Sequence, residues 1–161
     1  MLEICAGSPD AAILAAQAGA HRIELNAALP LGGLTPTVAS LRMSIENTDI
    51  PIIVMVRPRE GDFLYSAREF SQMQRESEAL LSAGAAGIAF GCIDATNSID
   101  RRRVQAMVRL AGDRETVFHR AFDMLPVMLD NMRLLQDLGV TRILTSGGKA
   151  IAWEGRQTLK A

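Results

Sequence analysis

Acidic, basic and imidazole side chains lie in or just after several short apolar runs of this 161-residue chain. Glu24 lies in the run at residues 22–25, His119 follows the run at 116–118, and Asp123 is four residues further on. A carboxylate and an imidazole can exchange protons with a bound small molecule near neutral pH. We therefore identify Glu24, His119 and Asp123 as candidate catalytic residues. His119 could equally be a metal ligand or a hydrogen-bonded core histidine.

A loop rich in arginine and acidic residues follows the apolar run at residues 52–57. Paired guanidinium groups can hold a carboxylate or phosphate through two hydrogen bonds each, and Arg–Asp pairs can also brace a loop, so both roles stay open. Ser146 precedes two glycines whose backbone N–H groups could hold an anion or form a turn. The candidate substrate-binding residues are Glu3, Arg57, Arg59, Asp62, Arg120 and Ser146.

Cys5 is the best candidate for binding a soft metal, because Cu(I) prefers thiolate and thioether ligands. Met55 and Met124 could lie nearby, although methionine more often fills a core. Cys5 could also be a small buried apolar residue. The only other cysteine is Cys92, and the spacing of the two fits no zinc motif.

The composition indicates a globular protein, with 48% apolar and 22% charged residues. The net charge of -1 and the mixed order of basic and acidic residues argue against nucleic-acid and membrane partners. No apolar run approaches the roughly 20 residues of a membrane span, and the N-terminus does not resemble a secretion signal. We therefore expect a cytoplasmic protein with reduced thiols.

Short apolar runs alternate with helical patterns along the chain, which predicts a parallel sheet with helices outside it. Three related segments, at residues 18–25, 83–90 and 138–145, each contain a glycine that ends a helix and an apolar strand that follows it. Such periodic modules favour a barrel over a doubly wound sheet. The predicted strands are 2–6, 22–26, 52–57, 87–91, 116–120 and 142–146, and the predicted helices are 9–18, 37–46, 67–83, 101–111 and 127–138.

Side chains alternate across each strand, so if Ile23 and Leu25 face the helices, Glu24 faces the barrel axis. The same alternation turns Ile88 and Ile143 toward the helices. We expect Glu3, Cys5, Arg22, Asn26, Met55, Arg57, His119, Leu144 and Ser146 to face inward. The charged residues would gather at the mouth formed by the strand carboxyl ends, where this fold carries its active sites. The alternative is a structural ion-pair layer, for example Glu24 with Arg57.

The sequence resembles the CutC family of copper homeostasis proteins. The resemblance rests on LEIC at 2–5, RIEL at 22–25, GGLTP at 32–36, RPREGDFLYS at 57–66, FHRAFDM at 118–124 and ILTSGG at 143–148. It implies an eight-stranded barrel and a role in copper handling. In the family, a cysteine matching Cys5 and a second cysteine are suspected copper ligands, and the second position is Asn26 here. Because a hard amide replaces a thiol, we expect at most weak binding of Cu(I).

A complete barrel of this type takes about 200 residues or more. We therefore expect one domain over residues 1–161, an incomplete α/β barrel of the TIM type with about six of eight parallel strands. A sixth helix would begin near Trp153 and Leu159, and the sheet would stay open between its first and last strands.

Three functional hypotheses follow. The first is a CutC-type protein that handles copper. The second is a small-molecule barrel enzyme with lyase-like or isomerase-like acid–base chemistry on an anionic substrate. The third is an inactive shortened product. The expected partners are a copper ion or a small anionic molecule, and open sheet edges could also lead to homo-oligomers.

Overall fold

Six parallel strands form one curled sheet, in a computed structural model that describes residues 1–160. The strands neighbour each other in chain order, which is the arrangement of a (β/α) barrel. They are β1 (Glu3–Ala6), β2 (Arg22–Leu25), β3 (Ile52–Met55), β4 (Gly87–Phe90), β5 (Glu115–Phe118) and β6 (Arg142–Ile143). The predicted incomplete barrel is confirmed, and β1 and β6 form the two edges of the described sheet.

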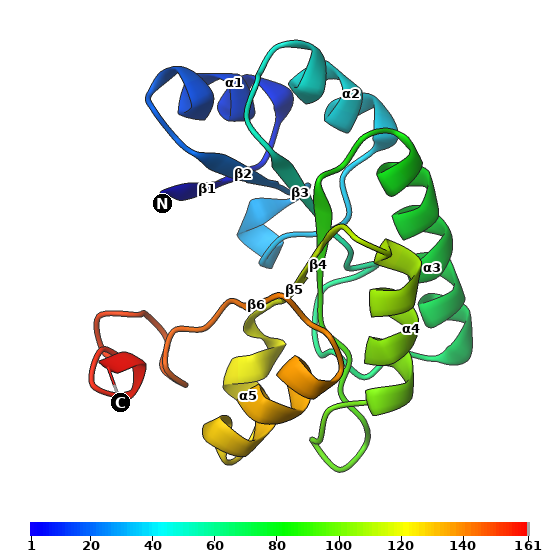
Figure 1. The fold of residues 1–161 in the computed structure, drawn as a ribbon, viewed down its shortest axis with the longest axis vertical. Helices are drawn as coiled ribbons and strands as arrows, with labels where there is room; N and C mark the ends of the chain where they lie inside the picture. Colours follow the sequence, from blue (N-terminus) through cyan, green and yellow to red (C-terminus); the bar gives the residue numbers. More distant parts are fainter. Residues whose placement is uncertain (161) are drawn as a thin grey trace.

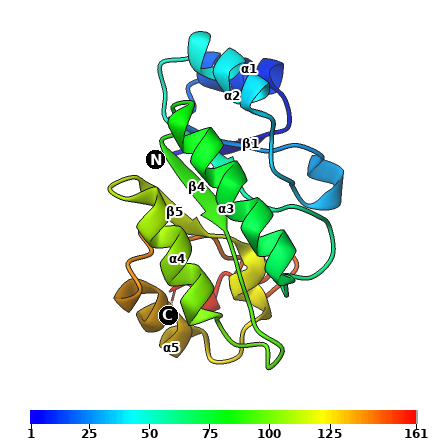
Figure 2. The same ribbon diagram turned by 90° about the vertical axis from the view of Figure 1, so that its right-hand side faces the viewer.

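Five α-helices cover the outer side of the sheet in an arc (Figure 1). They are α1 (Pro9–Gln17), α2 (Val38–Glu46), α3 (Ala67–Ser82), α4 (Arg101–Ala111) and α5 (Met128–Asp137). Turned by 90°, the molecule shows α3 and α4 lying over β4 and β5 (Figure 2). None of the helices in residues 1–160 has the length and apolar character needed to cross a membrane.

Side-chain caps and glycines set the helix boundaries. At the start of α3, the Ser66 hydroxyl accepts a hydrogen bond from the Glu69 N–H, and the Glu69 carboxylate accepts one from the Ser66 N–H. The glycines of the repeated segment, Gly19, Gly84 and Gly139, have φ angles of +91°, +107° and +88°. These angles suit glycine, which explains why the repeat places it where a helix turns toward the next strand.

Strand alternation separates two apolar layers. Ile23, Leu25 and Ile88 are fully buried in the larger layer between sheet and helices, and Ile143 packs against it. A smaller cluster lines the inner face and consists of Ile53, Met55, Ala89 and Val117, with Ala86 and Leu144 packed against it. The predicted facing of the strands is therefore confirmed for these residues.

The C-terminal part departs from the sequence prediction. Residues 150–157 form turns, followed by a short 3₁₀ helix, η3 (Thr158–Lys160), so the predicted sixth α-helix is wrong. The backbone of Gly155 lies so close to Ser146 that an added Cβ would come within 1.8 Å of the Ser146 carbonyl oxygen. This close approach holds the segment against the loop after β6.

The open sheet predicts association of the isolated 161-residue chain. The outer backbone groups of β1 and β6 have no strand partner among the described residues, and such edges are templates for pairing. We expect the chain to be marginally stable and to form edge-to-edge dimers or aggregates. Sedimentation measures the association, and thermal unfolding measures the stability. A monomer that unfolds cooperatively above about 65 °C, beyond the usual mesophile range, would contradict this expectation.

Candidate functional site

A cavity of about 240 Å³ opens at the carboxyl ends of the strands. Strand ends and the loops that follow β2, β3 and β5 supply its walls, as the TIM-type fold requires for a site at this face. Most of the wall is apolar, with a few charged and polar groups. The lining residues are Cys5, Glu24, Asn26, Leu29, Gly32, Met55, Arg57, Phe63, His119, Arg120 and Leu144.

The carboxylate of Glu24 is held from one side and free on the other. Its Oε1 accepts hydrogen bonds from Asn26 Nδ2 at 3.2 Å and from the Cys5 thiol at 3.4 Å. Its Oε2 is buried and has no hydrogen-bond partner within residues 1–160. Burial raises the pKa of Glu24, and the bonds from Asn26 and Cys5 only partly offset this effect. Glu24 is therefore a candidate proton donor or acceptor.

His119 is buried, and its side chain accepts one hydrogen bond. It lies one residue beyond β5, at the start of the 3₁₀ helix η2 (Arg120–Met124), where the sequence predicted that the strand continues. Its Nδ1 accepts from the Ala121 N–H at 3.1 Å, so the ring proton sits on Nε2. Burial, with a smaller contribution from Arg57, lowers the pKa of His119 to about 3. Its Nε2 has no partner among the described residues.

The hydrogen bond at Nδ1 bears on the roles of His119 that the sequence left open. A general base or a metal ligand needs a lone pair on the atom that faces the site, and here Nε2 carries a proton. A donor aimed at developing negative charge is the role that this geometry supports. Gly91 makes room for the ring, because a Cβ there would meet His119 Cε1 at 2.5 Å.

Arg57 both braces the mouth and lines the cavity. Its Nη1 donates to the carbonyl oxygens of Leu31 and Gly33, and its Nη2 donates to that of Gly61 at 2.8 Å. Its guanidinium lies 5.0 Å from the centre of the Phe63 ring. The ion pair between Glu24 and Arg57 that the sequence suggested as an alternative is not formed.

Arg59 and Asp62 lie outside the cavity. Arg59 pairs with Glu69 at 2.6 Å and with Asp62 at 2.9 Å, and it also donates to the Leu64 carbonyl. The bracing role therefore accounts for this part of the loop, and only Arg57 of the predicted pair of arginines reaches the site.

Asp123 fills the glycine-rich loop after β6. It accepts hydrogen bonds from the Thr145 hydroxyl, the Ser146 backbone and hydroxyl, and the Gly148 N–H, and it pairs with Arg120 at 2.9 Å. Burial alone would raise the pKa of Asp123, but these bonds outweigh it and lower the pKa to about 2. The loop expected to hold an external anion thus holds an internal carboxylate, and neither Asp123 nor Ser146 lines the cavity.

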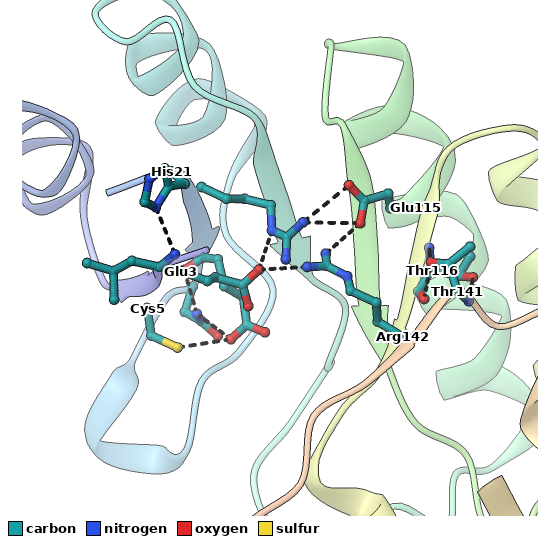
Figure 3. A network of polar contacts seen from close by, with 11 residues as sticks. Glu3, Cys5, His21, Glu115, Thr116, Thr141 and Arg142 are labelled. Atoms are coloured by element: carbon teal, nitrogen blue, oxygen red, sulfur yellow. Dashed lines mark hydrogen bonds and ion pairs between the residues drawn. The ribbon is translucent and has the colours of Figure 1, made fainter. Parts of the chain in front are cut away.

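Glu3 lies at the opposite, N-terminal end of the strands, so its predicted place at the mouth is wrong. It is the first residue of β1, and it pairs with Arg22 and with Arg142 at 3.3 Å (Figure 3). Glu115 completes the network by pairing with Arg22 at 3.3 Å and with Arg142 at 2.7 Å. The sequence left open a structural ion-pair layer, for example Glu24 with Arg57. Such a layer exists, but it consists of Glu3, Arg22, Glu115 and Arg142.

The soft donors do not form a copper site with several thiolates. Cys5 and Met55 line the cavity, whereas Cys92 is buried in the layer under the helices and Met124 is 65% exposed. Cys5 is exposed, so the alternative of a small buried residue is wrong; partial burial of its thiol and the neighbouring Glu24 raise the pKa of the thiol. Within residues 1–160, no group of three His, Cys, Asp or Glu side chains could hold a metal ion.

Two wall residues, Leu29 and Phe63, could not be predicted from the sequence, because the conformation of their loops brings them to the cavity and has no periodic signal. A signal existed for the neighbouring glycine pair. Gly33 has a φ of +85°, and a Cβ there would meet Asn26 Oδ1 at 2.3 Å, so the loop closes directly on Asn26.

Comparison with known proteins places these residues in a family, since the model of the CutC family matches residues 1–161. The chain belongs to the CutC family. A CutC family protein of Treponema denticola is 44% identical over 154 residues, which are 96% of this chain and 63% of that protein. One of Photorhabdus laumondii is 44% identical over 159 residues, 99% of this chain and 64% of that protein. The chain thus spans less than two thirds of these relatives.

Solved structures agree with this assignment. A CutC protein of Streptococcus agalactiae, provisionally named a copper homeostasis protein, superposes with a TM-score of 0.92 at 26% identity, covering 99% of this chain and 80% of that one. A 2,3-dimethylmalate lyase gives a TM-score of 0.65 at 14% identity, covering 99% of this chain and 62% of the lyase. The second likeness shows the barrel fold alone.

The ion-pair layer predicts a stability effect at Glu3. Glu3→Gln would leave Arg22 and Arg142 with a single carboxylate, Glu115. We expect a loss of about 1–2 kcal/mol in the free energy of unfolding, between the values of exposed and buried pairs. Denaturant unfolding of this CutC chain measures it.

The matched control is Asp130→Asn, which removes the exposed pair with Arg133 at 4.0 Å. It should change the free energy of unfolding by no more than about 0.5 kcal/mol. Equal effects of the two substitutions would show that the layer contributes nothing specific.

Proposed function

We propose that the cavity is the active site of a small-molecule enzyme in which Glu24 transfers a proton and His119 stabilises negative charge on an oxygen. One observation carries this proposal. The cavity is lined by three residues with a buried polar atom that has no partner in the described part of the chain: Glu24 Oε2, His119 Nε2 and Arg57 Nε. A buried polar group without a partner costs about 1–3 kcal/mol, so a site that keeps three of them requires an explanation.

Each group would have a separate role. Glu24 is fixed by Asn26 and Cys5, which leaves Oε2 directed away from both donors and available to a substrate C–H or O–H. His119 stays neutral and offers Nε2–H to an oxygen that gains charge when the proton leaves. This pairing suits enolate-forming steps, as in aldol, isomerase or lyase chemistry. Asp123 takes a bracing role in this proposal because its oxygens are already occupied.

Proton exchange at carbon tests the proposal without knowledge of the full reaction. The chain is incubated in D₂O with pyruvate, 2-oxobutyrate, acetoacetate or dihydroxyacetone, and loss of the C–H signal next to the carbonyl is followed by NMR. We expect at least one compound to exchange, and Glu24→Gln to slow exchange about 100-fold or more. Glu78→Gln, an exposed glutamate on α3, is the matched control.

The pH profile of exchange provides a second readout. Glu24 must be ionised to accept a proton, so the rate should rise with pH through a pKa above that of an ordinary carboxyl group. His119 should add no step between about pH 5 and 9, because its pKa is about 3. Absence of exchange with every compound, or equal exchange in Glu24→Gln, would contradict the proposal.

Copper handling is the second candidate, favoured by the Cys5 thiol in the same cavity and by the name of the Streptococcus agalactiae protein. Cys5 and Met55 are soft donors, but the amide of Asn26 is bonded to Glu24 and the Cys5 thiol has a raised pKa. Copper would have to displace the thiol proton and break the bond to Glu24. The proposal is therefore weak binding at one site that depends on Cys5.

Chelator competition measures this prediction. We expect Cu(I) to bind the chain weakly, with one equivalent at most, and Cys5→Ala to remove this binding. Cys92→Ala is the control, since that thiol is buried away from the cavity. Tight binding that survives Cys5→Ala would overturn both the weakness and the ligand.

A further inference from the structure

The charge of Arg57 has no counter-ion. The residue is only 7% exposed, and its hydrogen bonds go to three uncharged carbonyl groups. No carboxylate of residues 1–160 lies within ion-pairing distance of it, whereas Arg59 pairs with two acidic residues and Arg120 pairs with Asp123. Buried charges in proteins are normally paired, so an uncompensated guanidinium in a cavity wall points to an anionic ligand.

Glu24 and His119, which like Arg57 have a buried atom without a partner among the described residues, indicate the other groups of that ligand. His119 Nε2–H needs an acceptor, and a carboxylate oxygen is a strong one. Glu24 Oε2 is an acceptor whose carboxylate is already bonded by Asn26 and Cys5, so it needs a donor from the ligand. An anion with one hydroxyl group satisfies both atoms at once.

The rest of the cavity limits the size of the ligand. Leu29, Met55, Phe63 and Leu144 supply apolar wall, which suits a short carbon chain. A volume of about 240 Å³ lies at the small end of the range of ligand cavities, which suits a small ligand. Arg120 lies beside His119 at the rim, where its charge is already paired with Asp123 and its Nη2 donates to Ser146, so Arg57 remains the cation without a counter-ion.

We propose that this cavity binds a short-chain hydroxycarboxylic acid. Its carboxylate supplies the counter-ion of Arg57 and accepts from His119, and its hydroxyl group donates to Glu24. The ligand class rests on the proposed function, because it occupies the same cavity and uses the same two residues. It adds the selection of substrate by charge and by a single hydroxyl group.

Calorimetric titration with four matched compounds tests the proposal on the unmodified chain. 2-Hydroxybutyrate carries both groups, butyrate lacks the hydroxyl, 1,2-butanediol lacks the carboxylate, and 2-oxobutyrate replaces the donor by an acceptor. We expect 2-hydroxybutyrate to bind about tenfold or more tightly than the diol, and severalfold more tightly than butyrate and the oxo acid. Absence of binding by all four compounds, or equal affinity of the hydroxy acid and the diol, would overturn the proposal.

Glu24→Gln should change the preference of the cavity from a ligand hydroxyl group to a ligand carbonyl group. Asn26 and Cys5 donate to Oε1, so the glutamine carbonyl should take that position and its NH₂ should replace Oε2 as a donor. The preference should then reverse in favour of 2-oxobutyrate, whereas Arg133→Gln on exposed α5 should change nothing. A retained preference for the hydroxy acid would refute the assignment of Glu24.

The two proposals fail separately. Selective binding of 2-hydroxybutyrate without carbon exchange in any compound would keep the ligand class and remove the proposed acid–base chemistry. Glu24-dependent exchange in compounds that bind no more tightly than the diol would keep the chemistry and remove the ligand class.

Discussion

The sheet edges are held together by charge rather than by backbone pairing. β1 and β6 are the two edges of the described sheet, yet Glu3 on the first strand pairs with Arg142 on the last, 139 residues away. Arg22 and Glu115 extend this contact to β2 and to β5. The layer closes the interior at the N-terminal end of the strands. The ion pair links the two edges at one end of the sheet, and Cys5, Glu24 and His119 line one cavity at the other end.

The polar groups around the cavity fall into two sets: those bonded within the protein and those without a partner. Most polar groups have partners within the protein. Arg59 braces its loop, Asp123 bonds to the loop after β6, and Asn26 donates to Glu24. Such saturated groups give rigid walls, because moving them would leave buried atoms without partners. The buried atoms of the cavity wall that have no partner among the described residues, on Glu24, His119 and Arg57, are therefore the ones free to contact a ligand.

Alternation and repetition made the sheet predictable from the sequence. The side chains of Ile23, Glu24 and Leu25 point to alternate faces of the sheet. Once one apolar residue is assigned to the helix side, the facing of every other residue in the strand follows. The same reasoning predicted that Cys5, Glu24, Arg57 and His119 meet at one site. It failed for Glu3, because facing inward does not say at which end of the strand a side chain lies. Strand alternation also could not predict the hydrogen-bond partners of Arg57 and Asp123, because these depend on loop conformations that no periodic pattern encodes.

The carboxylate of Asp123 makes the loop after β6 a binding site that carries its own ligand. Because Asp123 is tethered to the chain, it competes with any free anion at a high effective concentration. A phosphate group approaching Ser146 and Gly148 would have to displace a partner that cannot diffuse away. The fold therefore disfavours phosphates in this loop by occupancy, which leaves the guanidinium group of Arg57 as the proposed binding group for an anion.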